Sequence, residues 1–228
     1  MGIANLALRS IFAHARLTLA RLKLIPLEEF SPGMSLDEIK SEYADTLYSA
    51  MADYLDSGQP ITSFRNAVRR AVNDGFTLAF YAGYADAGGS GEIPEDAISW
   101  LSGRIESEIE FTDGLFADLK ALRADKESRE DEKLSWARAR ANGYTGTLTG
   151  VYAQGKTWGD ENIEGEWVFG DTVEHCSTCS DLNGKKHPLK WFRDNGYIPQ
   201  ESGSSTLECG GYQCLCTVID KDGNQLLP

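Results

Sequence analysis

Hydrophobic residues recur with helical spacing through the first two thirds of the chain. Apolar positions three and four residues apart predict a helix over about 36–56, and Ser35 followed by Glu38 forms a capping-box sequence at its start. A second run, rich in Phe and Tyr over 64–84, predicts another helix that ends before the glycine-rich segment 88–91. Aromatic residues at this spacing indicate core packing rather than a binding stripe.

The pattern continues with two more helical regions and one ambiguous stretch. Pro94, followed by acidic residues, predicts the start of a helix, and the Thr-Asp-Gly sequence at 112–114 predicts a kink or a division in it. Mixed acidic and basic residues over 118–140 predict one exposed helix with many salt bridges. The segment 141–158 is rich in Gly, Thr and Tyr and shows only weak helical character.

The N-terminal segment Ile3–Ile25 is predicted to form a basic amphipathic helix that ends at Pro26. Arg9, Arg16 and Lys23 are seven residues apart and would line one stripe. This stripe suits an acidic partner surface, DNA phosphates or a membrane face. A solvated face of an ordinarily packed helix is the favoured alternative.

Beyond about residue 160 the pattern changes to short apolar runs, such as 167–169 and 216–219. Turn sequences separate these runs, which is typical of small strands and hairpins: Asn183-Gly184, Asp194-Asn195-Gly196 and Asp222-Gly223. We therefore predict a mainly α protein, with a helical domain over 1–160 and a small α+β lobe with short strands over 161–228.

Composition and charge limit the classes of function. The chain has 228 residues, with 22 Lys and Arg against 35 Asp and Glu, and a net charge of −13. Most of its surface therefore repels nucleic acid, so contact with DNA would need a local basic patch. No apolar run approaches the length needed to cross a bilayer, and the first 20 residues lack the order of a signal peptide. We expect neither membrane insertion nor secretion.

The five cysteines are the strongest chemical signal, because all of them lie within one fifth of the chain: Cys176, Cys179, Cys209, Cys214 and Cys216. An odd, clustered set without an export signal indicates a metal site rather than a disulfide framework. A Cys-x-x-Cys pair and a second cysteine group about 30 residues later can enclose one tetrahedral ion. Zinc suits such thiolates, and a closed all-thiolate site would be structural.

The ligand set has more candidates than one ion needs. Cys176 and Cys179 are the surest pair, Cys214 is the next, and either Cys209 or Cys216 is the fourth. His175 is expected to lie outside the set, since a ligand directly beside Cys176 would need unfavourable geometry. Two alternatives are reduced cysteines buried without metal and a redox Cys-x-x-Cys, although no βαβ pattern surrounds the pair.

A basic and aromatic group lies within the lobe, around Trp191 and Phe192, and it could grip a phosphate strand: Lys185, Lys186, Lys190 and Arg193. The favoured alternative is a turn over the metal site with lysines extended along it. From Glu166 onward, nine acidic and five basic residues give a net charge of −4.

Enzyme signatures are missing from the sequence. The chain has three histidines, none in a known catalytic motif, and no phosphate loop, zinc-protease or hydrolase motif. A zinc deaminase would need a His-x-Glu sequence ahead of its cysteines, which is absent. We therefore expect no enzymatic activity and no small-molecule substrate.

The order of several lobe residues resembles the C-terminal domain of the phage head-morphogenesis (Mu F-like minor head protein) family: Trp167, Gly170-Asp171-Thr172, Cys176-x-x-Cys179, Leu182-x-Gly184, Pro199 and Cys214-x-Cys216. The resemblance covers roughly 60 residues of the chain. Family members often carry a His shortly before the closing Cys-x-Cys, and the resemblance implies that Cys209 replaces it as a ligand here.

The resemblance implies a virion protein of the head interior or portal vertex, present in the host cytoplasm during assembly. Its implied partners are the portal protein, the major capsid protein or both, with possible contact to DNA. It would act in head assembly, DNA packaging or ejection, and no reaction is established for the shared domain. A zinc-ribbon factor that binds nucleic acid is the alternative function.

Overall fold

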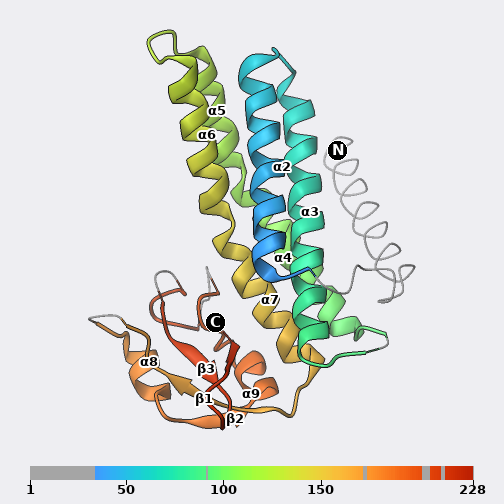
Figure 1. The fold of residues 1–228 in the computed structure, drawn as a ribbon, viewed down its shortest axis with the longest axis vertical. Helices are drawn as coiled ribbons and strands as arrows, with labels where there is room; N and C mark the ends of the chain where they lie inside the picture. The colour runs from blue at the N-terminus through green and yellow to red at the C-terminus, as the bar shows by residue number, and fades with distance from the viewer. Residues whose placement is uncertain (1–33, 91, 172–173, 202–205, 212–213, 228) are drawn as a thin grey trace, which may run out of the picture.

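The computed structural model describes residues 34–90, 92–171, 174–201, 206–211 and 214–227. The predicted basic helix Ile3–Ile25 lies outside these residues. Six helices form an elongated bundle beside a small lobe (Figure 1): α2 (Leu36–Asp56), α3 (Ile61–Asp86), α4 (Glu95–Phe111), α5 (Asp113–Ala124), α6 (Glu130–Tyr144) and α7 (Gly146–Gly159). In the described part of the chain, no helix combines the length and hydrophobicity needed to cross a bilayer.

The predicted starts and ends of the first helices are confirmed. The Ser35 hydroxyl accepts a hydrogen bond from the Glu38 N–H at 3.3 Å, and the Glu38 carboxylate accepts one from the Ser35 N–H at 2.7 Å, as in a capping box. Thr112 is both the C-cap residue of α4 and the N-cap residue of α5, so the Thr-Asp-Gly sequence divides the two helices.

The prediction of one helix over 118–140 is wrong, because α5 ends at Ala124 and α6 begins at Glu130. The Asp125 carboxylate accepts hydrogen bonds from the Glu127 N–H at 2.8 Å and the Ser128 hydroxyl at 2.6 Å. Such local bonds compete with helix formation. The expected salt bridges are present, and one joins the two helices, from Arg140 to Asp118 at 3.5 Å.

The weak helical character expected over 141–158 is also wrong, since α7 occupies most of this segment and is largely buried. Its glycines allow close approach to α3. A Cβ atom at Gly155 would lie 2.1 Å from the Phe80 carbonyl oxygen, and one at Gly83 would lie 2.0 Å from the Tyr152 carbonyl oxygen. Helix packing therefore outweighs the low helix propensity of glycine here.

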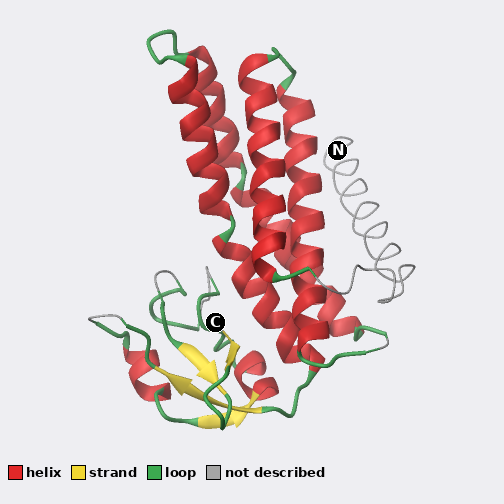
Figure 2. Ribbon diagram, viewed as in Figure 1, coloured by secondary structure: helices red, strands yellow, loops and turns green. Residues whose placement is uncertain are grey.

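The lobe combines short strands and helices (Figure 2): β1 (Glu164–Val168), α8 (Ser177–Leu182), β2 (Lys186–Pro188), α9 (Leu189–Asp194), β3 (Thr217–Ile219) and β4 (Gln225–Leu227). The strands form an antiparallel sheet in the order β2-β1-β3-β4. The predicted fold class, mainly α with a small α+β lobe, is confirmed.

The predicted turns have two different roles in the lobe. Asp222-Gly223 joins β3 to β4, with Gly223 at a φ of 84°, as expected for a hairpin. Asn183-Gly184 and Asn195-Gly196 instead follow the ends of α8 and α9. Glycine at positive φ is a common helix terminator as well as a hairpin residue, so the sequence alone does not separate the two roles.

The core of the lobe surrounds Trp167 and Phe192, which are fully buried, and it includes Ala153 of α7. Arg193 of α9 also reaches α7. Its guanidinium donates to the Thr157 carbonyl oxygen at 2.8 Å and lies 3.6 Å from the centre of the Trp158 ring. Helix α7 thus packs against both the bundle and the lobe.

Candidate metal centre

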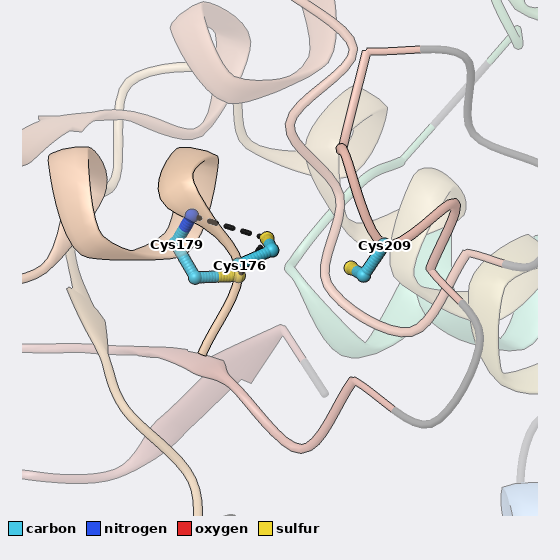
Figure 3. Close-up of side chains that lie close together, drawn as sticks. All are labelled: Cys176, Cys179 and Cys209. Carbon is cyan, nitrogen blue, oxygen red and sulfur yellow. Dashed lines mark hydrogen bonds between the residues drawn. The ribbon is translucent and has the colours of Figure 1, made fainter. Parts of the chain in front are cut away.

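The Cys-x-x-Cys pair lies at the start of α8. Cys176 is the residue before the first turn, and its Sγ accepts a hydrogen bond from the Cys179 N–H at 3.4 Å. The Cys176 and Cys179 sulfurs are 3.3 Å apart. Figure 3 shows these two side chains together with Cys209. This turn brings the two sulfurs to the same side of the backbone without any contribution from the rest of the lobe.

Cys209 reaches the same place from the segment 206–211, which hydrogen bonds hold against α8. The Glu208 carboxylate accepts from the Ser177 N–H at 2.7 Å and from the Ser177 hydroxyl at 2.6 Å, and the Glu208 N–H donates to Thr178 Oγ1 at 3.2 Å. The bonds from the Ser177 hydroxyl and N–H lower the pKa of Glu208, which is a carboxylate at neutral pH. Cys209, next in sequence, is therefore fixed opposite Cys176.

Cys214 and Cys216 approach from the sheet, because they directly precede β3. Both are buried, with 7% and 1% of their surface exposed. The intervening Leu215 is exposed, as expected for an extended segment in which alternate side chains point to opposite faces. The pairing of β3 with β1 fixes the direction of this segment.

These segments bring the five thiols together in two overlapping groups of three. Cys176, Cys179 and Cys209 form one group, and Cys179, Cys214 and Cys216 form the other; within each group the sulfurs lie within 4.8 Å of one another. All five cysteines are free thiols. Soft sulfur donors at this spacing fit zinc or a related ion, whose tetrahedral ligands lie about 3.8 Å from one another for Zn–S bonds of about 2.3 Å.

Burial and neighbouring thiols shift the pKa values of the clustered cysteines. Burial raises the pKa of Cys179, and the neighbouring thiols raise it further; burial also raises the pKa values of Cys209 and Cys214. Burial acts the same way on Cys176, but hydrogen bonds from Cys179 and Cys209 outweigh it and lower the Cys176 pKa. A bound dication would compensate the charge of several neighbouring thiolates, with release of their protons.

The structure brings together every cysteine that the sequence singled out. Cysteine clusters that could hold a metal ion are therefore shown, while the identity of the metal stays a prediction. The choice between Cys209 and Cys216 as a fourth ligand stays open, since each belongs to a group that contains Cys179.

His175 lies nearer to the cluster than its position beside Cys176 suggested. Its ring stacks on Phe169 with the ring centres 3.8 Å apart, and its Nδ1 lies 3.8 Å from Cys216 Sγ. The contact joins residues 41 positions apart, so spacing along the sequence could not reveal it. The imidazole of His175 therefore contacts Cys216, although it belongs to neither group of three.

The basic group around Trp191 is largely compensated by carboxylates. Lys186 pairs with Glu166 at 3.2 Å, and Lys190 lies 3.6 Å from both Glu161 and Asp194. Arg193 is buried and pairs with Glu161 at 2.8 Å. Lys185 is exposed. Trp191 stacks on His187 with ring centres 3.6 Å apart. The four predicted cations therefore do not form one exposed surface of like charge.

No protein-family model, curated protein or solved structure matches this chain.

Proposed function

We propose that this chain is a structural protein of a phage head, which acts near the portal in head assembly, DNA packaging or ejection and contains a structural zinc site. The observation that carries the proposal is the cysteine cluster, which ties three separate segments of a small lobe together. Such a site stabilises a fold that has too little core of its own. A closed, thiolate-rich site suits structure better than catalysis.

Several residues on which the resemblance is based have a structural role in this lobe, which supports the proposal. Trp167 is fully buried, and its carbonyl oxygen accepts a hydrogen bond from the Gly184 N–H at 2.8 Å. Gly184 has a φ of 77°, which favours glycine. A Cβ atom at Gly170 would lie 1.9 Å from the Leu215 carbonyl oxygen, so glycine permits this approach to the cysteine segment.

The partners proposed from the resemblance are the portal protein, the major capsid protein or both. A zinc-ribbon factor for nucleic acid is the second candidate, and its support is the exposed Lys185, two residues before His187, whose ring stacks on Trp191. The ion pairs of Lys186 and Lys190 and the net charge of −4 from Glu166 onward weigh against it.

The test is the composition of particles from the phage genome that encodes this chain. Mass spectrometry of purified particles should detect the chain, and cryo-EM should place it at the portal vertex. Particles that carry Cys214→Ser should contain less of it, whereas the exposed neighbouring variant Leu215→Ser should enter normally. Absence from wild-type particles would overturn the proposal, and tight binding to DNA at physiological salt by the purified chain would favour the nucleic-acid factor instead.

A further inference from the structure

We propose that the five thiols hold two metal ions that share the sulfur of Cys179, with His175 as the remaining protein ligand. The proposal rests on the metal-stabilised lobe of the proposed function and changes its stoichiometry. A thiolate sulfur has several lone pairs, so one cysteine can bind two ions. Cys179 is the member common to both cysteine groups.

The geometry of the sulfurs carries this inference. Four ligands around a single tetrahedral zinc would all lie about 3.8 Å from one another. The residues described by the structure provide two sets of three sulfurs rather than one set of four, even with the spacing relaxed to 4.8 Å. One ion would leave at least one sulfur of the cluster without a metal, whereas two ions use all five.

The inner ion would bind Cys179, Cys214 and Cys216. These three side chains are 2%, 7% and 1% exposed, so the site is closed to solvent. His175 Nδ1 lies 3.8 Å from Cys216 Sγ, and its ring stacks on Phe169. His175 belongs to neither group of ligand atoms within 4.8 Å of one another, so its imidazole has to move closer to Cys179 and Cys214 when the inner ion binds. Three thiolates and one imidazole form a complete structural site, a common set for zinc.

The outer ion would bind Cys176, Cys179 and Cys209. Cys176 and Cys209 are only partly buried, which leaves the side of this ion away from Cys179 open toward solvent. Three protein ligands and an open position, which water can fill, make an exchangeable site. The hydrogen bonds between Glu208 and Ser177 already hold Cys209 against α8, so the fold of the lobe depends less on this ion.

The net charge of the cluster also favours two bound ions over one. Two dications with five thiolates and a neutral imidazole carry a net charge of −1. One dication with four thiolates carries −2 and leaves a fifth thiol in contact with it. Since charge is costly to bury, the arrangement with two ions is better compensated in this partly buried cluster.

Zinc analysis of the full chain tests the stoichiometry. Protein purified with reductant and without chelator should contain about two zinc ions per chain, the Cys209→Ser variant about one, and the exposed α8 control Ser180→Ala about two. One ion in both the wild type and Cys209→Ser overturns the two-ion centre and leaves the single structural site of the proposed function. No zinc in any of them overturns both, and two ions in Cys209→Ser overturn the assignment of the outer site.

Cadmium-113 NMR of the cadmium-loaded full chain tests the shared sulfur directly. Two ions joined through Cys179 Sγ should give two resonances that are split by coupling to each other. Cys209→Ser should reduce the spectrum to one unsplit resonance. Two resonances without mutual splitting would contradict a common sulfur ligand, whatever the effect of any variant on stability.

Discussion

The helical bundle and the cysteine lobe are ordered by different physical means. Bundle helices α2 and α3 have 21 and 26 residues, and their core contains large side chains with at most 1% exposure, such as Phe64, Phe76 and Met51. The lobe has strands of three to five residues and helices of six, and three of its buried core residues are cysteines. Burial of apolar area stabilises the bundle, whereas we expect the lobe to depend on a cross-link between its short elements.

Helix α7 is the element that contacts both the bundle and the lobe. Glycines allow its close packing against α3. Near its C-terminal end, the Thr157 carbonyl oxygen accepts a hydrogen bond from Arg193 of the lobe. The comparison therefore predicts that damage to the cysteines stays in the lobe, while damage to α7 reaches both regions. The four predictions below test this difference, from the largest expected effect to the smallest.

The largest effect is expected from the loss of the metal or of a buried ligand. Cys214→Ser, or a strong chelator, should unfold the segment after about residue 160, because structural zinc sites supply on the order of 10 kcal/mol of binding free energy. The bundle helices α2 to α6 should stay folded. Hydrogen exchange measured by mass spectrometry would show the loss of protection in the elements after about residue 160, β1 to β4 with α8 and α9, and unchanged protection in α2 to α6.

Leu215→Ser is the matched control, since Leu215 lies next to Cys214 but is 48% exposed. It should leave exchange in the lobe unchanged. Full protection of the lobe in Cys214→Ser would show that the small apolar core suffices without the thiol cluster.

The second effect concerns the contact between α3 and α7. Gly155→Ala places a Cβ atom 2.1 Å from the Phe80 carbonyl oxygen, so the helices must separate, at a cost of about 3 kcal/mol. Gly103→Ala in the middle of α4 meets no atom within 4 Å and should instead stabilise by about 0.5–1 kcal/mol, because alanine is the better helix former. Denaturant unfolding would measure both values. Equal effects of the two variants would contradict the close packing of α7.

The same glycines explain which parts of the fold the sequence could predict. Helices α2 and α3 have regular apolar spacing and clear boundaries, so local signals suffice for them. In helix α7, Gly155 and Gly159 lie against α3, and this reason for a glycine appears only in the folded chain. The break at Asp125 depends on hydrogen bonds to Glu127 and Ser128, which compete with an otherwise continuous pattern of helix-forming residues.

The sequence likewise predicted some features of the candidate site and not others. Cysteine spacing predicted a metal cluster, since each pair is local and thiols have few other roles when clustered. The position of His175 depends on Cys216, which precedes β3 and lies 41 positions away, and on the ring of Phe169 just after β1. The burial of Arg193 likewise depends on its packing against Trp158, which the basic composition of its own segment does not reveal.

The third effect concerns the attachment of the lobe to α7. Arg193→Met removes the donor to the buried Thr157 carbonyl oxygen and the ion pair with Glu161, at a cost of about 2–3 kcal/mol. Lys190→Met lies on the same helix and faces Glu161 and Asp194, but its pairs are solvent-exposed and should contribute less than about 1 kcal/mol. Thermal unfolding of both variants would rank them. A larger loss for Lys190→Met would contradict the assigned role of Arg193.

The smallest effect concerns a polar link between α3 and α7. Asp86 accepts a hydrogen bond from the Tyr152 hydroxyl at 2.8 Å and pairs with Lys156 at 3.0 Å. Burial alone would raise the pKa of Asp86, but the hydrogen bonds from Lys156 and Tyr152, together with the Lys156 charge, lower it. Because the Asp86 side chain is 52% exposed, its link should contribute at most about 1 kcal/mol.

The sign of its pH dependence follows from the lowered pKa. The stabilisation by Asp86 is fully present above the unfolded-state pKa of about 3.9, and it is lost as the pH falls through the lower pKa of the folded state. Asp86→Asn should therefore be less stable than the wild type at pH 7, and the difference should shrink below about pH 4. Asp74→Asn, on the same helix where the exposed Asp74 accepts a hydrogen bond from neighbouring Asn73, is the control and should show a smaller difference at pH 7. Urea unfolding from pH 3 to 7 would measure the difference, and a gap that widens toward low pH would refute the link to Lys156 and Tyr152.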